Sequence, residues 1–528
     1  MDTSSLSPEI LRNVCEHMDN AERFSMALTS RGFLEPALDS LWQDLYSFIP
    51  FISCLPADLW NIRDNPGPFE GDTTQVLHPR RMATPKDMDR YLSFYAPRIR
   101  SLRPHLLDNE MTLSIEAFEA IRLATGGKDG VLSPLLTNFY WPSPDAARYS
   151  LGEEFTKLLS PYMSLFLGSM VTTLYLPAPQ DTPLHAGSLD QALRQYPRLR
   201  TLVLQGTGSG FDREFIESCI TSFPWEDLEH VSVPFVTNPI IRHLARLPRL
   251  RKLVIQDSAE DSPVTIVTLP VGASDAFFPA LKSFKISGSL PALQALLHCI
   301  PPTNAITHIH CMPTEDHLSI SERQDIIKTI TTRCNPSTLT RLILFQGGPD
   351  YESIDNPLDV DLSQEIDISP IFRFRELREL KLWFEDPVRL TPAEFATIPK
   401  AFPNIKTLDF GSFMALNFIP PRINHTHLIS LLQGCPYLIS LKLLFDASEI
   451  SGEVVPGAPF PLEYLEVNNS PIYSPSQVIS FMKVNLPNVT MIYGSESYLE
   501  DRNHNPAIFT RRWDRVKEEW RAYRCPRL

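Results

Sequence analysis

The sequence has few glycines, no paired cysteines and no long apolar run, and each absence argues against a class of protein. Its 528 residues include 21 glycines against 48 prolines, a balance that indicates many short elements joined by rigid connections. The 8 cysteines are scattered singly without a Cys-x-x-Cys pair, which argues against a disulfide framework or a zinc site. No stretch approaches the roughly 18 consecutive apolar residues that a membrane span requires.

The net charge and the N-terminal sequence indicate where in the cell the protein acts and which classes of partner it binds. A formal net charge of −14 argues against broad nucleic-acid binding. The N-terminus lacks a basic segment followed by an apolar run, so we expect no signal peptide. We therefore expect a cytoplasmic or nuclear chain with reduced thiols, and neither a nucleic acid nor a membrane as partner.

Known catalytic patterns are missing as well. The sequence contains no Gly-x-Ser-x-Gly, His-Glu-x-x-His or Walker motif. A glycine-rich stretch at 206–211 has Phe211 where a dinucleotide-binding fingerprint needs its third glycine. His308, His310 and Cys311 suggest a metal site, but on a strand Cys311 would point away from both histidines. We therefore expect no catalytic residue, no cofactor and no metal.

The first 50 residues carry three helix patterns. Ser7 is suited to cap the first helix, and Asp19 or Asn20 the second; a third pattern runs from Phe33 to Leu45. Apolar residues recur at spacings of three to four, which predicts one apolar stripe on each helix. A unit of about 40 residues lies near the lower size limit for independent folding, so we expect it to complete its apolar contacts on another protein.

In order and spacing, residues 4–46 resemble an F-box of the form common in fungi. The match rests on Leu6-x-Pro8-Glu9-Ile10-Leu11, Phe24-x-x-x-Leu28-x-x-x-x-Phe33 and Ala37-Leu38-x-x-Leu41-Trp42. Ser7 and the stretch 29–33 depart from the usual motif. The resemblance implies docking on the Skp-type adaptor of a cullin–RING ubiquitin ligase. The positions that match the family's apolar contact or core residues are Leu6, Pro8, Ile10, Leu11, Val14, Leu28, Leu41 and Trp42.

A second pattern, apolar-x-x-apolar-x-apolar, recurs from about residue 96 onward. Six clear copies and eight weaker ones make fourteen in all. The clear copies contain Leu202, Leu253, Phe284, Leu380, Leu408 and Leu441, and the weaker ones begin at Ile99, Leu136, Val171, Leu228, Ile306, Leu339, Leu462 and Val489. Helical patterns lie between several of them, at 212–221, 239–247, 290–299, 321–333 and 391–401.

This pattern resembles a degenerate leucine-rich repeat. Each repeat would supply one strand and one helix, and stacking the units would bury apolar faces that no unit buries alone. We therefore predict an α/β fold, with a three-helix F-box at 1–50 and a solenoid at 96–495 whose parallel sheet forms one wall. The irregular spacing leaves a non-repeating α/β domain as the alternative.

Three stretches fall outside the two patterns. Residues 51–95 include a segment rich in proline, glycine, aspartate and arginine, which we interpret as a linker. Residues 347–370 contain seven acidic residues and no lysine, which predicts an inserted acidic loop. Within 496–528, Trp513, Val516 and Trp520 lie at helical spacing among many arginines, which predicts a basic terminal helix that caps the fold.

The repeat pattern also predicts which side chains line the open wall of the sheet, because alternate residues of a strand face opposite ways. Those positions hold Tyr140, Tyr175, Lys252, Lys285, His308, His310, Arg341, Phe345, Lys381, Trp383, Asp409, Lys442, Tyr464, Glu466 and Tyr493. Our hypothesis is that this wall selects a protein with an acidic or phosphorylated segment. The tentative binding residues are Lys252, Lys285, Arg341, Phe345, Lys381, Trp383 and Lys442. Alternatively, the lysines serve only solubility.

These predictions together suggest a substrate-recognition subunit that catalyses nothing itself. By resemblance, the F-box would bind the Skp-type adaptor and, through it, the cullin scaffold, while the solenoid would hold a protein substrate of unknown identity. Two alternatives remain open. One is a scaffold that uses its F-box outside a ligase, and the other is an enzyme built on an unrecognised α/β domain.

Overall fold

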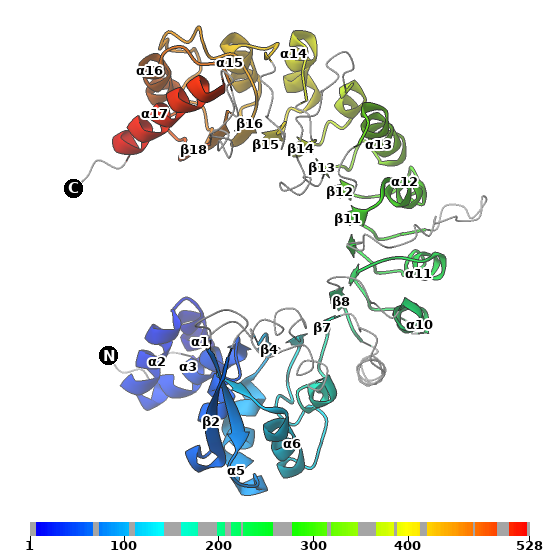
Figure 1. Ribbon diagram of the computed structural model, residues 1–528, viewed down its shortest axis with the longest axis vertical. Coiled ribbons are helices and arrows are strands. Elements are labelled where there is room, and N and C mark those ends of the chain that lie inside the picture. Colours follow the sequence, from blue (N-terminus) through cyan, green and yellow to red (C-terminus); the bar gives the residue numbers. More distant parts are fainter. Residues whose placement is uncertain are drawn as a thin grey trace. The chain divides into compact units, whose positions relative to one another are not determined.

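The computed structural model describes residues 7–66, 73–104, 111–141, 160–177, 198–205, 213–222, 225–256, 277–313, 318–346, 366–384, 388–411, 420–467, 470–493 and 506–524. These residues form two compact units, which we call the N-terminal unit (Met1–Leu250 with Ser258–Ser262) and the C-terminal unit (Arg251–Asp257 with Pro263–Leu528). Both are α/β solenoids with parallel sheets (Figure 1). No helix within the ranges above is long and apolar enough to cross a membrane.

The N-terminal unit opens with three helices, and the sheet follows. The helices are α1 (Pro8–Glu16), α2 (Asn20–Thr29) and α3 (Arg31–Gln43). The parallel strands, in spatial as in chain order, are β1 (Asp44–Leu45), β4 (Ser101–Leu102), β6 (Asn138–Tyr140), β7 (Thr173–Pro177), β8 (Thr201–Gln205) and β9 (His230–Val233). Further helices include α4 (Ile49–Ser53), α5 (Pro85–Arg90), α6 (Ile115–Ala124), α10 (Arg213–Ser222) and α11 (Asn238–Leu244).

Local capping explains where the first helices begin. The Ser7 side chain accepts from the Ile10 amide at 3.4 Å, and Pro8 occupies the first turn, where its missing N–H removes no bond. Asp19, not Asn20, caps α2, and it forms a capping box with Glu22. The third helix ends at Gln43, two residues earlier than we predicted, because Asp44 and Leu45 pair in parallel with Ser101 and Leu102. The helices therefore run directly into the first strand of the sheet.

The interpretation of residues 51–95 as a linker is wrong for the described part of that range. It contains an antiparallel pair, β2 (Trp60–Pro66) and β3 (Thr73–Pro79), and β5 (Thr112–Leu113) extends this second sheet in parallel with β3. Leu59, Met88 and Tyr91 are buried. Arg81 holds the segment together through ion pairs with Asp58 and Asp87. The charged, proline-rich composition of this segment therefore belongs to a small folded sheet with helices, and not to a linker.

In the C-terminal unit, strands and helices alternate as the repeat pattern predicts. The parallel strands, again in chain order, are β10 (Lys252–Gln256), β11 (Ser283–Gly288), β12 (His308–Pro313), β13 (Arg341–Phe345), β14 (Glu379–Trp383), β15 (Thr407–Asp409), β16 (Ser440–Lys442), β17 (Tyr464–Glu466) and β18 (Met491–Tyr493). The helices α12 (Leu290–His298), α13 (Ile320–Arg333), α14 (Pro392–Ala401), α15 (His425–Gly434) and α16 (Pro475–Asn485) lie on one side of this sheet (Figure 1).

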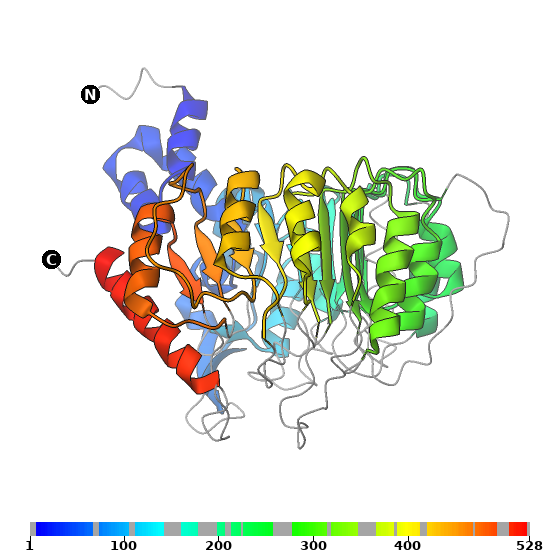
Figure 2. The same ribbon diagram turned by 90° about the horizontal axis from the view of Figure 1, so that it is seen from above.

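The burial of alternate strand residues confirms the repeat. On β11, Phe284 and Ile286 are buried against the helices, while Lys285 between them lies on the opposite, open face. The predicted terminal helix is present as α17 (Pro506–Arg524), which crosses the end of this unit (Figure 2). Trp513 and Trp520 are buried, and their indole N–H groups donate to the carbonyls of Ser470 and Val489, both at 2.8–2.9 Å. This helix thus covers the edge of the last repeat.

Candidate functional site

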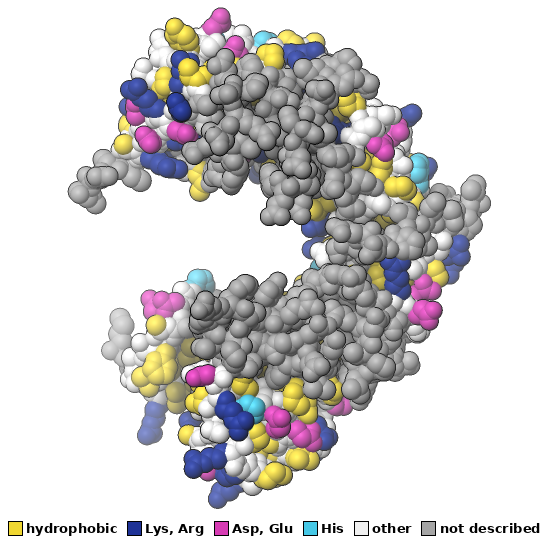
Figure 3. Space-filling view, in the orientation of Figure 1, with side chains coloured by type: hydrophobic (Ala, Val, Ile, Leu, Met, Phe, Trp, Pro, Cys, Tyr) yellow, Lys and Arg dark blue, Asp and Glu magenta, His cyan; other side chains and the backbone are white. Residues whose placement is uncertain are grey.

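The three N-terminal helices expose an apolar surface. We define the apolar helical surface as Ile10 and Val14 of α1, Phe24 and Leu28 of α2, and Leu34 of α3. Phe24 is 59% exposed and Leu28 is 71% exposed. Each of the first two pairs is spaced i, i+4, so its members share one helix face. Figure 3 shows hydrophobic side chains gathered over this helical part of the molecule.

The exposure follows from a core of small side chains. The buried cluster between the helices consists of Cys15, Ala27 and Ala37, with Met26 packed against it. Arg23 also joins two of the helices, because its guanidinium donates to the carbonyls of Cys15 at 2.8 Å and Glu16 at 3.1 Å. Small side chains let the helices approach closely and leave little interior volume for larger residues such as Phe24 and Leu28. Those larger residues therefore remain on the outside.

The residues predicted from the F-box resemblance have different environments. Ile10, Val14 and Leu28 belong to the apolar helical surface, and Leu11 is buried. Leu41 is half-buried, and so is Trp42, whose ring stacks on Tyr95 at a centroid distance of 4.3 Å. Pro8 opens α1, and Leu6 lies outside the described residues. Sequence reasoning did not assign Phe24 a contact role, although its i, i+4 spacing from Leu28 was the available signal.

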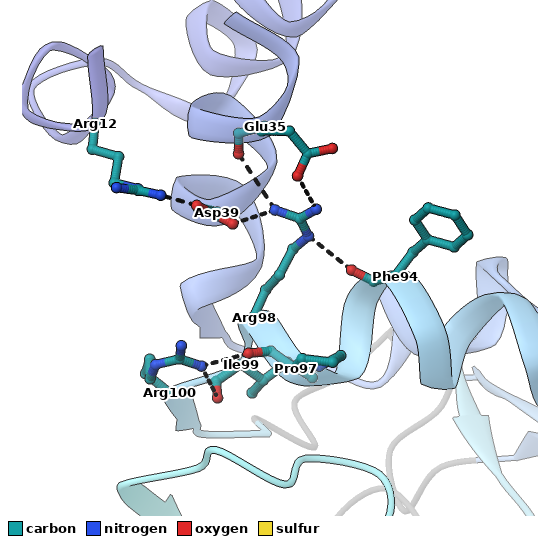
Figure 4. Close-up of polar contacts among 8 residues, drawn as sticks. All are labelled: Arg12, Glu35, Asp39, Phe94, Pro97, Arg98, Ile99 and Arg100. Atoms are coloured by element: carbon teal, nitrogen blue, oxygen red, sulfur yellow. Dashed lines mark hydrogen bonds and ion pairs between the residues drawn. The ribbon is translucent and has the colours of Figure 1, made fainter. Parts of the chain in front are cut away.

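A polar cluster holds α3 to the segment that precedes β4 (Figure 4). Arg98, whose side chain is only 12% exposed, pairs with the carboxylates of Glu35 and Asp39, and Arg12 of α1 reaches the other oxygen of Asp39 at 3.1 Å. The Arg98 Nε also donates to the carbonyl of Phe94 at 2.7 Å. We call Arg98, Glu35 and Asp39 the clamp. With the Trp42–Tyr95 stack, it fixes the helices on the rest of the N-terminal unit.

On the open face of the C-terminal unit, the strand register brings the predicted cations together. Lys252 of β10, Ser283 of β11, His308 of β12, Arg341 of β13 and Glu379 of β14 form one row across the sheet. Two residues further along, Lys285, His310 and Lys381 form a second row, with Ile343 between the last two. Arg341 and Lys381 both pair with Glu379, the latter at 3.0 Å. Two cations therefore share one carboxylate.

Lys442, also predicted to contact a partner, is buried within the unit's own network. Its ammonium lies 2.7 Å from a Glu466 oxygen and 4.1 Å from the centre of the Trp383 ring. It passes so close to Gly411 that an ideal Cβ there would lie 2.6 Å from Lys442 Cε. Asp409 is buried beside it, and its carboxylate accepts from the Gly411 amide at 3.0 Å. The Lys442 ammonium is therefore already engaged by Glu466 and Trp383, and the side chain packs within its own unit.

Burial raises the pKa of Asp409 to about 6, against the opposing pull of Lys442. The folded chain therefore holds this proton more tightly than the unfolded chain, and stability decreases as the pH rises from about 4 to about 6. We expect Asp409→Asn to remove about 1–3 kcal/mol of that decrease, measured by thermal unfolding across this pH range. Asp325→Asn, at an exposed position of α13, is the matched control. A parallel pH profile for wild type and Asp409→Asn would contradict the assignment.

Further open-wall residues in the described part of the chain are the tyrosines of the N-terminal unit and the histidines of β12. In the N-terminal unit, Tyr140 and Tyr175 stack at 4.1 Å, and the Arg103 guanidinium lies 4.0 Å from the Tyr140 ring centre. In the C-terminal unit, Cys311 is fully buried on the face opposite His308 and His310. The described residues contain no group of three or more His, Cys, Asp or Glu side chains arranged to hold a metal. The glycine-rich stretch (206–212) and most of the predicted acidic loop (347–365) lie outside the described residues.

Comparison with known proteins identifies no close relative: no family model and no curated protein matches the sequence. Solved structures do match by fold, among them the crystal structure of the Rad7 and Elc1 complex in yeast. That chain is 11% identical, and the alignment covers 94% of this chain and 92% of that one, with a TM-score of 0.34. A TM-score this low describes a remote resemblance, from which no function follows.

Proposed function

We propose that this protein is the substrate-recognition subunit of a cullin–RING ubiquitin ligase. The apolar helical surface would dock on a Skp-type adaptor, and the solenoid would hold a protein substrate. The observation that carries the proposal is the exposure of Ile10, Phe24 and Leu28 on a three-helix unit whose own core is built of small side chains. Large apolar side chains that cluster outside such a core are typical of a protein-binding surface. The F-box resemblance of the same residues supplies the class of partner.

The chain itself would contribute proximity. A ligase subunit that binds both the adaptor and a target turns ubiquitin transfer into a reaction between groups held in one assembly. The wide sheet of each unit offers side chains on its open face for binding, which suits a receptor. No catalytic group is required of the chain in this role.

Co-purification from cells tests the proposal. Full-length chain is expressed with an affinity tag, and the recovered adaptor and cullin are quantified by mass spectrometry. Recovery of both supports the proposed function. Recovery of the adaptor without a cullin supports instead a scaffold that acts outside a ligase. Recovery of neither would overturn both readings of the helical unit and leave the enzyme alternative.

A further inference from the structure

Charged side chains are distributed unequally over the open face of the C-terminal unit. Strands β10 to β14 carry Lys252, Lys285, Arg341 and Lys381 against one carboxylate, that of Glu379, on a protein whose net charge is −14. Within the described ranges, Lys252 and Lys285 have no ion-pair partner. Strands β15 to β17 carry Asp409, Lys442 and Glu466, and there the one cation is already paired. The excess positive charge is therefore confined to β10–β14, and we call those four cations the cationic strip.

An aromatic surface lies beside the cationic strip. Phe345 ends β13 and Trp383 ends β14, and their ring centroids are 5.3 Å apart. These two positions are paired in the register and lie two residues further along the strands than the row of Lys285 and Lys381. Both side chains are half-buried, and the Lys442 ammonium lies 4.1 Å from the centre of the Trp383 ring. We call Phe345 and Trp383 the aromatic platform.

We propose that the cationic strip and the aromatic platform together bind one extended segment of a partner protein, with an acidic or phosphorylated residue on the strip and an aromatic or large aliphatic residue on the platform. This inference rests on the proposed function, since the segment would belong to the recruited substrate. It adds the chemistry and the spacing of that segment. Charge complementarity favours an acidic residue in the segment, because within the part of the chain that the structure describes no carboxylate pairs with Lys252 or Lys285.

The sheet geometry sets the spacing. The platform lies two to three strands away from Lys285, at about 4.8 Å per strand, and two residues further along the strand direction. The direct distance from Lys285 to the platform is therefore roughly 12–16 Å. An extended chain advances about 3.3–3.6 Å per residue. The acidic and the apolar residue of the segment should therefore lie three to five positions apart.

His310 reports on the bound acid. It lies between Lys285 of β11 and Lys381 of β14, with Arg341 and Glu379 also near, and burial together with the cations lowers its pKa to about 4. A bound anion would add an opposing charge and raise that pKa. For a glutamate peptide, whose carboxylate stays largely ionised above pH 5, binding should then tighten as the pH falls from neutral toward 5, a response that a purely apolar contact would not produce. A phosphate group would take up a proton of its own in this range, so the glutamate peptide is the one to use.

Fluorescence anisotropy of labelled eleven-residue peptides on the full chain tests the inference. Each peptide carries phosphoserine, glutamate or serine at one position and tryptophan or alanine placed two, four or seven residues away, in both chain directions. We expect the acid–tryptophan pair at four residues to bind at least about tenfold more tightly than the other spacings and than the serine or alanine peptides. A preference for phosphoserine over glutamate would assign a phosphorylated target, and equal binding an acidic one.

Variants tie the binding to this face. Lys285→Glu should weaken the best peptide at least about tenfold, whereas Lys328→Glu, at an exposed position of α13, should leave its affinity unchanged. The pKa of His310, followed by NMR of selectively labelled histidine, should rise on peptide binding. Equal affinity for all peptides, or equal effects of the two lysine variants, would overturn the inference. Adaptor recovery does not depend on Lys285. If the wild-type chain recovers the adaptor but binds none of the peptides, the inference alone is refuted and the proposed function survives.

Discussion

Replacing Phe24 and Leu28 together with aspartate is expected to abolish recovery of the Skp-type adaptor. Burying each of these side chains in an interface contributes about 1.5–3 kcal/mol, and a carboxylate in their place would have to be dehydrated. The combined loss corresponds to at least about a 100-fold weaker affinity. Both side chains are more than half exposed in the free chain, so the unfolding temperature should not fall. Pull-down and calorimetric titration with purified adaptor measure the affinity.

A substitution of the same kind elsewhere on the N-terminal unit provides the control. Leu123 of α6 is 54% exposed and lies outside the three helices, so Leu123→Asp should leave adaptor binding intact. Alanine at Leu11 would be a poor probe, because that side chain is buried and its loss would disturb the helices themselves. If Leu123→Asp and the double variant lose the adaptor equally, the apolar helical surface has no special role.

The strands of both units could be predicted because each depends on a local pattern. Leu202 and Leu204, or Phe284 and Ile286, are large apolar residues at alternate positions, and all four are buried. The fourteen copies correspond to the strands β4 and β6 to β18. The intervening helices begin and end within about three residues of the predicted bounds, since their caps are also local signals.

What the sequence could not reveal depends on partners distant along the chain. Asp44 and Leu45 continue a helical pattern, and only their pairing with Ser101 and Leu102 makes them a strand. The sequence likewise identified Lys442 as a cation on the wall but not that Glu466 and Trp383, from two other strands, occupy it. Whether a charge is free to bind a partner is a property of the assembled sheet, which no single repeat encodes.

The clamp around Arg98 is a second feature of this kind, and its removal should have a large local effect. Arg98 lies 59 residues from Asp39 and 63 from Glu35 in the sequence, and it holds both carboxylates with one guanidinium. Asp39 would keep Arg12, but Glu35 would lose its partner within the clamp. We expect Arg98→Ala to destabilise the attachment of the helices by about 2–4 kcal/mol. Amide exchange in α3 and β1 should then be roughly 30- to 700-fold faster.

Two comparisons separate the clamp from a general loss of stability. Arg98→Lys keeps the charge but not the planar fork that contacts two carboxylates and the Phe94 carbonyl, so it should restore only part of the protection. Amides of α13 in the C-terminal unit should exchange at the wild-type rate in both variants. Unchanged exchange in α3 of Arg98→Ala would mean that the β1–β4 pairing and the Trp42–Tyr95 stack suffice without the clamp.

The clamp also provides a test of the proposed function, because a variant can bind the adaptor and the substrate normally and still position the substrate poorly. In the proposed function, adaptor affinity would depend on the apolar helical surface and peptide affinity on the cationic strip, and Arg98 belongs to neither. In a reconstituted ligase, Arg98→Ala should therefore bind the adaptor and the substrate as wild type does. Ubiquitin transfer to the substrate should nevertheless slow, because helices that move on the solenoid no longer hold the target at one distance from the ubiquitin-loaded enzyme. A wild-type transfer rate from a chain whose α3 exchanges faster would show that a rigid attachment is not what the ligase requires.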